Sequence, residues 1–203
     1  MITLWGGQTS RSLRVAWLLE EMALPYAVRQ VDMLAPEPDP QFLAINPAYF
    51  LPAIQDGEVV MVESIAIMEY LMARYGPTPL VPAPQSPDFP AYQQFLHLGE
   101  AGLATLMMPV IVSRFLAPEA ERENWGAAWC LQALQKRLNL VSARLAASPY
   151  LAGETFTAAD ISVTYALGLG QRTLGLALDE VLQGYVERTT GREGYRRALG
   201  RSS

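Results

Sequence analysis

The chain has 203 residues, of which 51% are hydrophobic and 17% are charged, and its formal net charge is −5. This composition is typical of a globular protein, and it argues against nucleic acid as the main partner because no basic cluster is present to neutralise phosphates. A single cysteine, Cys130, and a single histidine, His97, exclude a disulfide framework or a His/Cys metal cluster built within the chain.

The N-terminal stretch has neither the basic lead nor the long apolar core of a signal peptide. We also expect no segment of membrane-spanning length. The expectation is a cytoplasmic protein with no membrane partner and no metal.

The first elements form a β-α-β unit. Residues 2–5 are an apolar run that ends at Gly6-Gly7, and an amphipathic helix then stops before Pro25. Residues 28–32 read as a second strand, parallel to the first. Thr9, Ser10 and Ser12 therefore lie at the start of the first helix.

A hairpin and a second long helix follow. After a proline-rich loop, residues 41–45 form at most a short helix, and two apolar runs then flank the turn dipeptide Asp56-Gly57. Helical spacing begins after Glu63-Ser64. The order up to Tyr75, β-α-β-α-β-β-α, predicts a thioredoxin-like α/β domain.

The junction between hairpin and helix offers groups for an amino-acid ligand. Ser64 as the N-cap would leave its N–H and hydroxyl for an anionic group, and Glu63 could hold an ammonium. The Leu51-Pro52 bond is a candidate for the cis form, which would turn the Leu51 backbone outward to pair with an extended peptide.

The second half of the chain is predicted to be all helical. Six prolines between Gly76 and Pro90 mark a linker, and helices are expected over 89–115, bent at Pro109, and over 125–145. Thr157 and Asp160 form a capping box that we assign to folding. We expect a thioredoxin-like domain at 1–76, a linker at 77–90 and an all-helical domain at 91–203.

The ordered set Leu51-Pro52, Asp56-Gly57 and Glu63-Ser64 resembles the second half of the thioredoxin-like domain of cytosolic glutathione transferases. The resemblance implies a glutathione-binding domain and a helical substrate-binding domain, with glutathione as co-substrate and no metal. It implies that the backbone beside Pro52 pairs with the cysteinyl unit, and that Glu63 and Ser64 hold the γ-glutamyl end. It also implies a homodimer, a hydrophobic second substrate and a role in detoxification.

Glutathione chemistry requires a thiolate. A thiol with a pKa of about 8.5 is mostly protonated at neutral pH, and lowering that pKa by about two units takes roughly 2.7 kcal/mol of selective stabilisation. A hydroxyl hydrogen bond at a helix N-terminus can supply this. Alignment on Arg14 favours Ser10 as the sulfur donor, with Thr9 close behind and Ser12 more naturally an N-cap. No tyrosine or cysteine lies between residues 2 and 14, which argues against a tyrosine-type or a cysteine-type site.

One departure from the family pattern concerns Tyr49-Phe50, which stand where a long polar side chain is common. Arg11, Gln8 or Gln41 would then serve the glycyl end of glutathione. The aromatic pair could form a pocket wall or a dimer anchor.

An apolar electrophile pocket is expected from Trp5 and from the helix after Pro109, although half of the helical residues must face the core. The candidates are Trp5, Met107, Met108, Ile111 and Phe115. The predicted function is conjugation of glutathione to hydrophobic electrophiles. The alternatives are disulfide or peroxide reduction or isomerisation with the same thiolate, and a non-catalytic dimeric binding protein.

Overall fold

The computed structural model describes residues 1–7, 10–122 and 124–201. They form two compact units, one made of Met1–Thr78 with the C-terminal segment from Gly191, and the other of Pro79–Thr190. The domain boundaries expected from the sequence remain a prediction. The compact units differ from them in two respects: the last helix packs with the first unit, and residues 79–90, expected as a linker, belong to the second.

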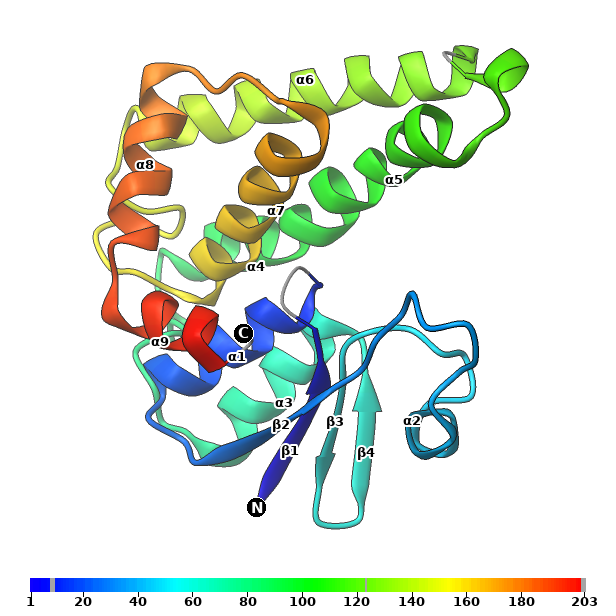
Figure 1. Cartoon of the computed structure of the whole chain (residues 1–203). Coiled ribbons are helices and arrows are strands. Elements are labelled where there is room, and N and C mark those ends of the chain that lie inside the picture. Colours follow the sequence, from blue (N-terminus) through cyan, green and yellow to red (C-terminus); the bar gives the residue numbers. More distant parts are fainter. Residues whose placement is uncertain (8–9, 123, 202–203) are drawn as a thin grey trace. The chain divides into compact units, whose positions relative to one another are not determined.

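The first unit is built on a mixed sheet. Within the described part of the chain it has four strands in the order β2-β1-β3-β4 (Figure 1). The strands are β1 (Ile2–Gly6), β2 (Tyr26–Gln30), β3 (Ala53–Asp56) and β4 (Val59–Val62). β1 runs parallel to β2 and antiparallel to β3, and the β3–β4 hairpin turns at Gly57, whose φ of 63° suits glycine. The predicted thioredoxin-like order is confirmed.

Helices cover both faces of this sheet. Helices α1 (Ser12–Glu21) and α3 (Ser64–Tyr75) lie on one face, and α2 (Pro40–Ile45) lies on the other (Figure 1). On the α2 side, Trp5 stacks on Phe42 with ring centroids 5.8 Å apart, and Val31 and Ala53 complete the cluster. Because successive side chains of a strand point to opposite faces of the sheet, Leu4 and Ile54 lie on the other face.

The C-terminal helix α9 (Glu193–Arg201) is held against α1 by ion pairs. Glu21 accepts two hydrogen bonds from Arg192, at 2.8 and 2.7 Å. Glu20, which is buried, pairs with Arg197 and with Arg201, each at 2.8 Å. These contacts explain why α9 joins the first unit rather than the helical one.

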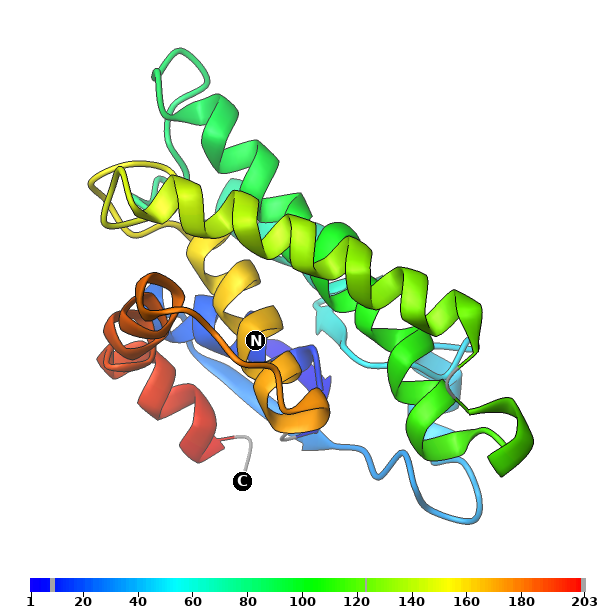
Figure 2. The same cartoon turned by 90° about the horizontal axis from the view of Figure 1, so that it is seen from above.

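The second unit is helical. Its helices are α4 (Phe89–His97), α5 (Thr105–Ile111), α6 (Trp125–Leu145), α7 (Ala158–Leu174) and α8 (Glu180–Thr190), with a short 3₁₀ turn, η3 (Glu119–Glu121). Two π-helical segments, η1 (Leu98–Ala104) and η2 (Val112–Leu116), extend α4 and α5 into one helical run. Helix α6 lies along this run (Figure 2).

The predicted long helix is therefore present, with departures from α-helical geometry on either side of Pro109. The first begins where the Ser162 hydroxyl of α7 donates to the Leu96 carbonyl at 2.8 Å, and a side chain that enters the helical hydrogen-bond ladder is a known cause of such departures. Gly99 permits this approach, because a Cβ there would meet the Ser162 backbone at 2.6 Å.

The run Phe89–Leu116 is also long and apolar enough, by length and composition, to cross a membrane. This corrects our expectation that no segment reaches that length. The criterion is weak evidence because core helices of soluble proteins meet it too. Leu96, Leu103 and Met107 of this run are fully buried.

The predicted capping box at the start of α7 is confirmed. The Asp160 carboxylate accepts from the Thr157 N–H at 2.8 Å, and its other oxygen accepts from the Leu151 N–H and the Tyr185 hydroxyl at 3.0 and 2.9 Å. Both residues are buried, which agrees with a role in folding.

Candidate active site

The loop between β1 and α1 carries the predicted sulfur donors. Ser10 is tied to Gly7, whose carbonyl accepts from the Ser10 N–H at 3.1 Å and from its hydroxyl at 2.9 Å. The second candidate, Thr9, lies outside the described residues, as does Gln8. Ser10 is half-buried, so part of its surface is open to a ligand.

Ser12 is buried and holds the loop together. Its hydroxyl donates to the Gly7 carbonyl at 3.0 Å and accepts from the Gly7 N–H at 3.1 Å. Helix α1 begins at Ser12 with Arg11 in the cap position, so the N-cap role expected for Ser12 is wrong. With its side chain enclosed, Ser12 has no surface for a sulfur atom.

The two serines are coupled. Their hydroxyl oxygens lie 2.5 Å apart, and the backbone N–H of Ser12 donates to the Ser10 oxygen at 3.2 Å. That N–H belongs to the first turn of α1 and has no partner within the helix. A donated N–H polarises the Ser10 hydroxyl, which makes it a better hydrogen-bond donor.

A groove of about 350 Å³ opens beside Ser10. Its lining combines the loop after β1, the end of β2 with the segment that follows it, and the residue before Pro52: Gly7, Ser10, Gln30, Val31, Asp32, Met33, Leu34 and Leu51. The structure thus brings Ser10 and Leu51 to one groove. The wall from Gln30 to Leu34 was missed, because nothing in its residue types suggested a ligand.

The Leu51–Pro52 peptide bond is cis, as the sequence suggested. Of the preceding aromatic pair, Tyr49 has a structural role. Tyr49 packs on Phe42 with centroids 5.3 Å apart, and its hydroxyl accepts from the Asp39 N–H at 2.7 Å. Phe50 is half-buried, and its carbonyl accepts from the Asn46 amide at 2.8 Å. Neither aromatic side chain lines the groove.

At the start of α3, Glu63 occupies the cap position and Ser64 is the first helical residue, which corrects the expected N-cap by one place. Glu63 is exposed and has a φ of 71°. The Ser64 hydroxyl is buried and accepts from the Arg14 guanidinium at 3.4 Å. Arg14 thereby links α1 to α3, although Pro52, Glu63, Ser64 and Arg11 do not line the groove at Ser10.

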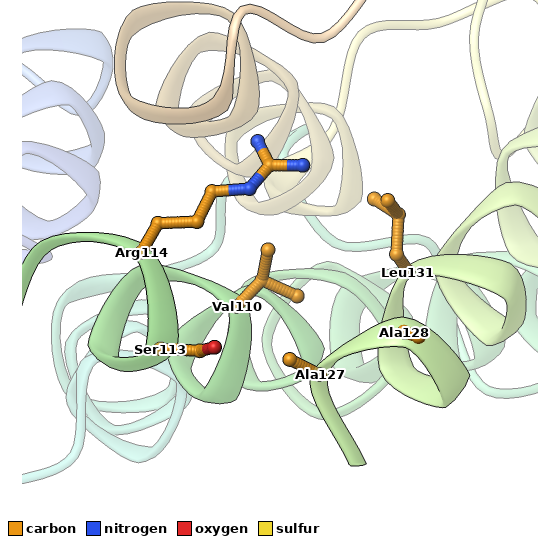
Figure 3. Close-up of a pocket in the computed structure, with 6 residues that line it drawn as sticks. All are labelled: Val110, Ser113, Arg114, Ala127, Ala128 and Leu131. Atoms are coloured by element: carbon orange, nitrogen blue, oxygen red, sulfur yellow. The ribbon is translucent and has the colours of Figure 1, made fainter. Parts of the chain in front are cut away.

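The expected electrophile pocket is only partly supported. Met107 is fully buried in the helical unit, and Trp5 is 7% exposed and packed under α2, so neither has surface to offer a ligand. Met108 and Phe115 are exposed and Ile111 is half-buried. The helical unit also has a pocket that the sequence did not suggest, between α5–η2 and α6 (Figure 3).

Cys130 is half-buried on α6 rather than a core residue. Within the described ranges, no group of three or more His, Cys, Asp or Glu side chains could hold a metal ion.

The first unit has a thioredoxin-like fold, with Ser10 in a groove at the start of its first helix. A helical unit follows it in the chain. Together they define a two-domain protein with an N-terminal thioredoxin-like domain. Models for the N-terminal and the C-terminal domain of glutathione S-transferase match residues 1–73 and 103–193. The chain therefore belongs to the glutathione S-transferase family, and it is a glutathione transferase.

Individual relatives agree with this assignment. Glutathione S-transferase 3 of Schizosaccharomyces pombe is 27% identical over 183 residues, which cover 85% of this chain and 75% of the relative. Glutathione S-transferase 3 of Zea mays is 34% identical over 157 residues, which cover 73% and 68%.

Among solved structures, a theta class glutathione S-transferase from Xanthomonas axonopodis pv. citri with glutathione bound superposes with a TM-score of 0.79 at 30% identity, covering 98% of this chain and 96% of that one. BphK, a bacterial transferase solved as a ternary complex, gives a TM-score of 0.85 at 27% identity, covering 98% of both chains.

Proposed function

We propose that this enzyme conjugates the thiolate of glutathione to hydrophobic electrophiles, and that the Ser10 hydroxyl donates a hydrogen bond to the sulfur. The observation that carries the proposal is the groove shared by Ser10 and Leu51. A tripeptide whose backbone pairs beside Pro52 would run along this groove with its thiol near the start of α1.

The hydrogen bonds around Ser10 support its role. Its oxygen accepts the Ser12 N–H, and its single proton can go to the Gly7 carbonyl, to the Ser12 oxygen or to a bound sulfur. When Ser12 is the donor across the 2.5 Å contact between the two hydroxyl oxygens, the Ser10 proton is available to a thiolate. A charge-assisted bond of this kind, with the partial positive charge of the helix start, favours the ionised thiol.

The other end of glutathione is assigned to α3. The Ser64 N–H at the helix start suits the γ-glutamyl carboxylate, with the buried Ser64 hydroxyl held on Arg14 behind it, and the exposed Glu63 suits the ammonium. The half-buried Arg11 is the cation proposed for the glycyl carboxylate, and Phe50 is proposed as apolar contact nearby.

The electrophile is proposed to contact the exposed apolar side chains of α5 and η2, namely Met108, Ile111 and Phe115. Flexible methionine side chains suit varied apolar substrates. We further propose that the protein is cytoplasmic, that it acts as a homodimer and that its reaction serves detoxification.

The test is the ionisation of bound glutathione. In Ser10→Ala, the apparent pKa of the bound thiol should rise by up to about two units, seen as loss of thiolate absorbance at neutral pH. Ser10→Thr keeps the hydroxyl and is the matched control. An unchanged titration in Ser10→Ala would remove Ser10 from the mechanism and move the assignment to Thr9, for which Thr9→Val is the corresponding variant.

The substrate class is tested separately. An aryl halide, an organic peroxide and a glutathionylated disulfide are offered in parallel with glutathione. Conjugation of the aryl halide at the highest kcat/KM supports the proposal, whereas faster turnover of the peroxide or the disulfide would replace conjugation by reduction.

A further inference from the structure

The pocket in the helical unit arises where two small residues of α6 meet the helical run. The Asn124 side chain caps α6 by accepting the Ala127 N–H at 3.0 Å, which fixes the first turn. Ala127 and Ala128 then present only methyl groups opposite Val110, and Leu131 closes one end (Figure 3). The hollow between them measures about 160 Å³.

The two polar side chains that line the pocket differ in how many of their hydrogen-bonding groups are available to a ligand. Ser113 is buried, and its hydroxyl already accepts from the Asn124 amide at 3.3 Å. Arg114 is exposed and extends past Val110 at the mouth of the pocket (Figure 3). Its guanidinium donates to the Leu174 carbonyl at 3.5 Å, and over the described ranges no carboxylate forms an ion pair with it. Most of its five N–H donors are therefore available to a ligand.

Size and charge together define the ligand. An apolar protein cavity of about 150 Å³ is known to hold a benzene ring, so this pocket has room for one six-membered ring. Arginine prefers a planar carboxylate, which it can bind through two parallel hydrogen bonds.

We propose that this pocket binds a small organic anion consisting of one aromatic ring and a carboxylate, with the ring between Val110 and Leu131 and the carboxylate on Arg114. The pocket lies wholly within the helical unit and shares no lining residue with the groove at Ser10. The proposal therefore goes beyond glutathione conjugation and does not depend on it.

The experiment is a ligand-observed NMR titration of the full chain with benzoate, in the absence of glutathione. Benzamide, which has the same shape without the charge, is the matched ligand and should bind about tenfold more weakly because the charge-assisted pair is lost. Equal affinities for the two compounds, or no benzoate binding, would overturn the proposal.

Two variants locate the site. Arg114→Gln should weaken benzoate about tenfold while leaving benzamide unchanged. Ala128→Leu should abolish the binding of both, because the larger side chain would fill the hollow from an exposed position on its lining. The controls are Lys136→Gln, which removes an exposed charge from α6, and Ala143→Leu, which adds the same bulk further along that helix.

Benzoate binding that survives Ala128→Leu would put the ligand elsewhere and refute the assignment. Binding that disappears as protein concentration rises would show that a second copy covers the pocket, which also refutes it. Ser10→Ala should bind benzoate like the wild type, so a failure of the glutathione proposal is distinguishable from a failure of this one.

Discussion

Replacing Gly99 with alanine should force two packed helices of the helical unit apart. The added Cβ would lie 2.6 Å from the Ser162 carbonyl carbon, where ordinary contact begins at 3.4 Å, so η1 and α7 must separate by about 0.8 Å. Because the obstacle is backbone, no rotamer change relieves it. Overpacking of this kind costs up to about 3 kcal/mol, and the better helix propensity of alanine returns about 1 kcal/mol.

The expected net loss is therefore about 2 kcal/mol in the free energy of unfolding, or a fall in Tm of roughly 4–8 °C for a chain of this length. The measurement is thermal unfolding by calorimetry, with urea denaturation as a second probe. Gly184→Ala on α8 is the matched control, because a Cβ there meets nothing within 4 Å, and it should raise stability by about 0.5–1 kcal/mol. If both substitutions stabilise the protein, the argument that Gly99 is required for close helix packing is wrong.

Three further outcomes are expected. Burial opposes ionisation of Glu21, but the Arg192 guanidinium and the Trp17 N–H hold the pKa of its carboxyl below the ordinary 4.5. This stabilisation is present above that ordinary value and is lost as the pH falls through the lowered pKa, so the Tm advantage of the wild type over Arg192→Gln should shrink below about pH 4.5. Tyr49→Phe leaves the Asp39 N–H without its acceptor and should lower Tm by about 2–4 °C in calorimetry, and an unchanged Tm would deny the hydroxyl that role. The Asp160 carboxylate accepts four hydrogen bonds, and in Asp160→Asn one of its oxygens becomes an NH₂ group that cannot accept them. The urea midpoint of this variant should therefore fall by more than that of Tyr49→Phe. A smaller fall would contradict the capping-box assignment.

Local signals in the sequence were sufficient for most of the fold. The Asp56-Gly57 turn, the helix after Glu63 and the box at Thr157 each depend on contacts within a few residues, and the structure agrees with all three. Errors at element ends were small, such as the N-cap of α3 placed at Ser64 instead of Glu63. The candidate groove was partly predictable from local signals too. Ser10 follows the Gly6-Gly7 loop, and Leu51 precedes Pro52.

Long-range packing decided what the sequence could not. Helical spacing identifies an apolar stripe but does not say whether it faces core or solvent, so Met107 and Phe115 looked alike and only one is buried. The place of α9 depended on ion pairs between Glu20 or Glu21 and arginines more than 170 positions away.

The sequence by itself determined the order of elements, the family resemblance and the serine at the start of the first helix. These features depend on the spacing of nearby residues and on the residue types that form turns. Only the tertiary structure decided that Ser12 is enclosed while Ser10 borders a groove, and that two alanines and an arginine form a second pocket. Burial and cavities are made by residues from separate elements, and their side-chain volumes meet only after the chain has folded.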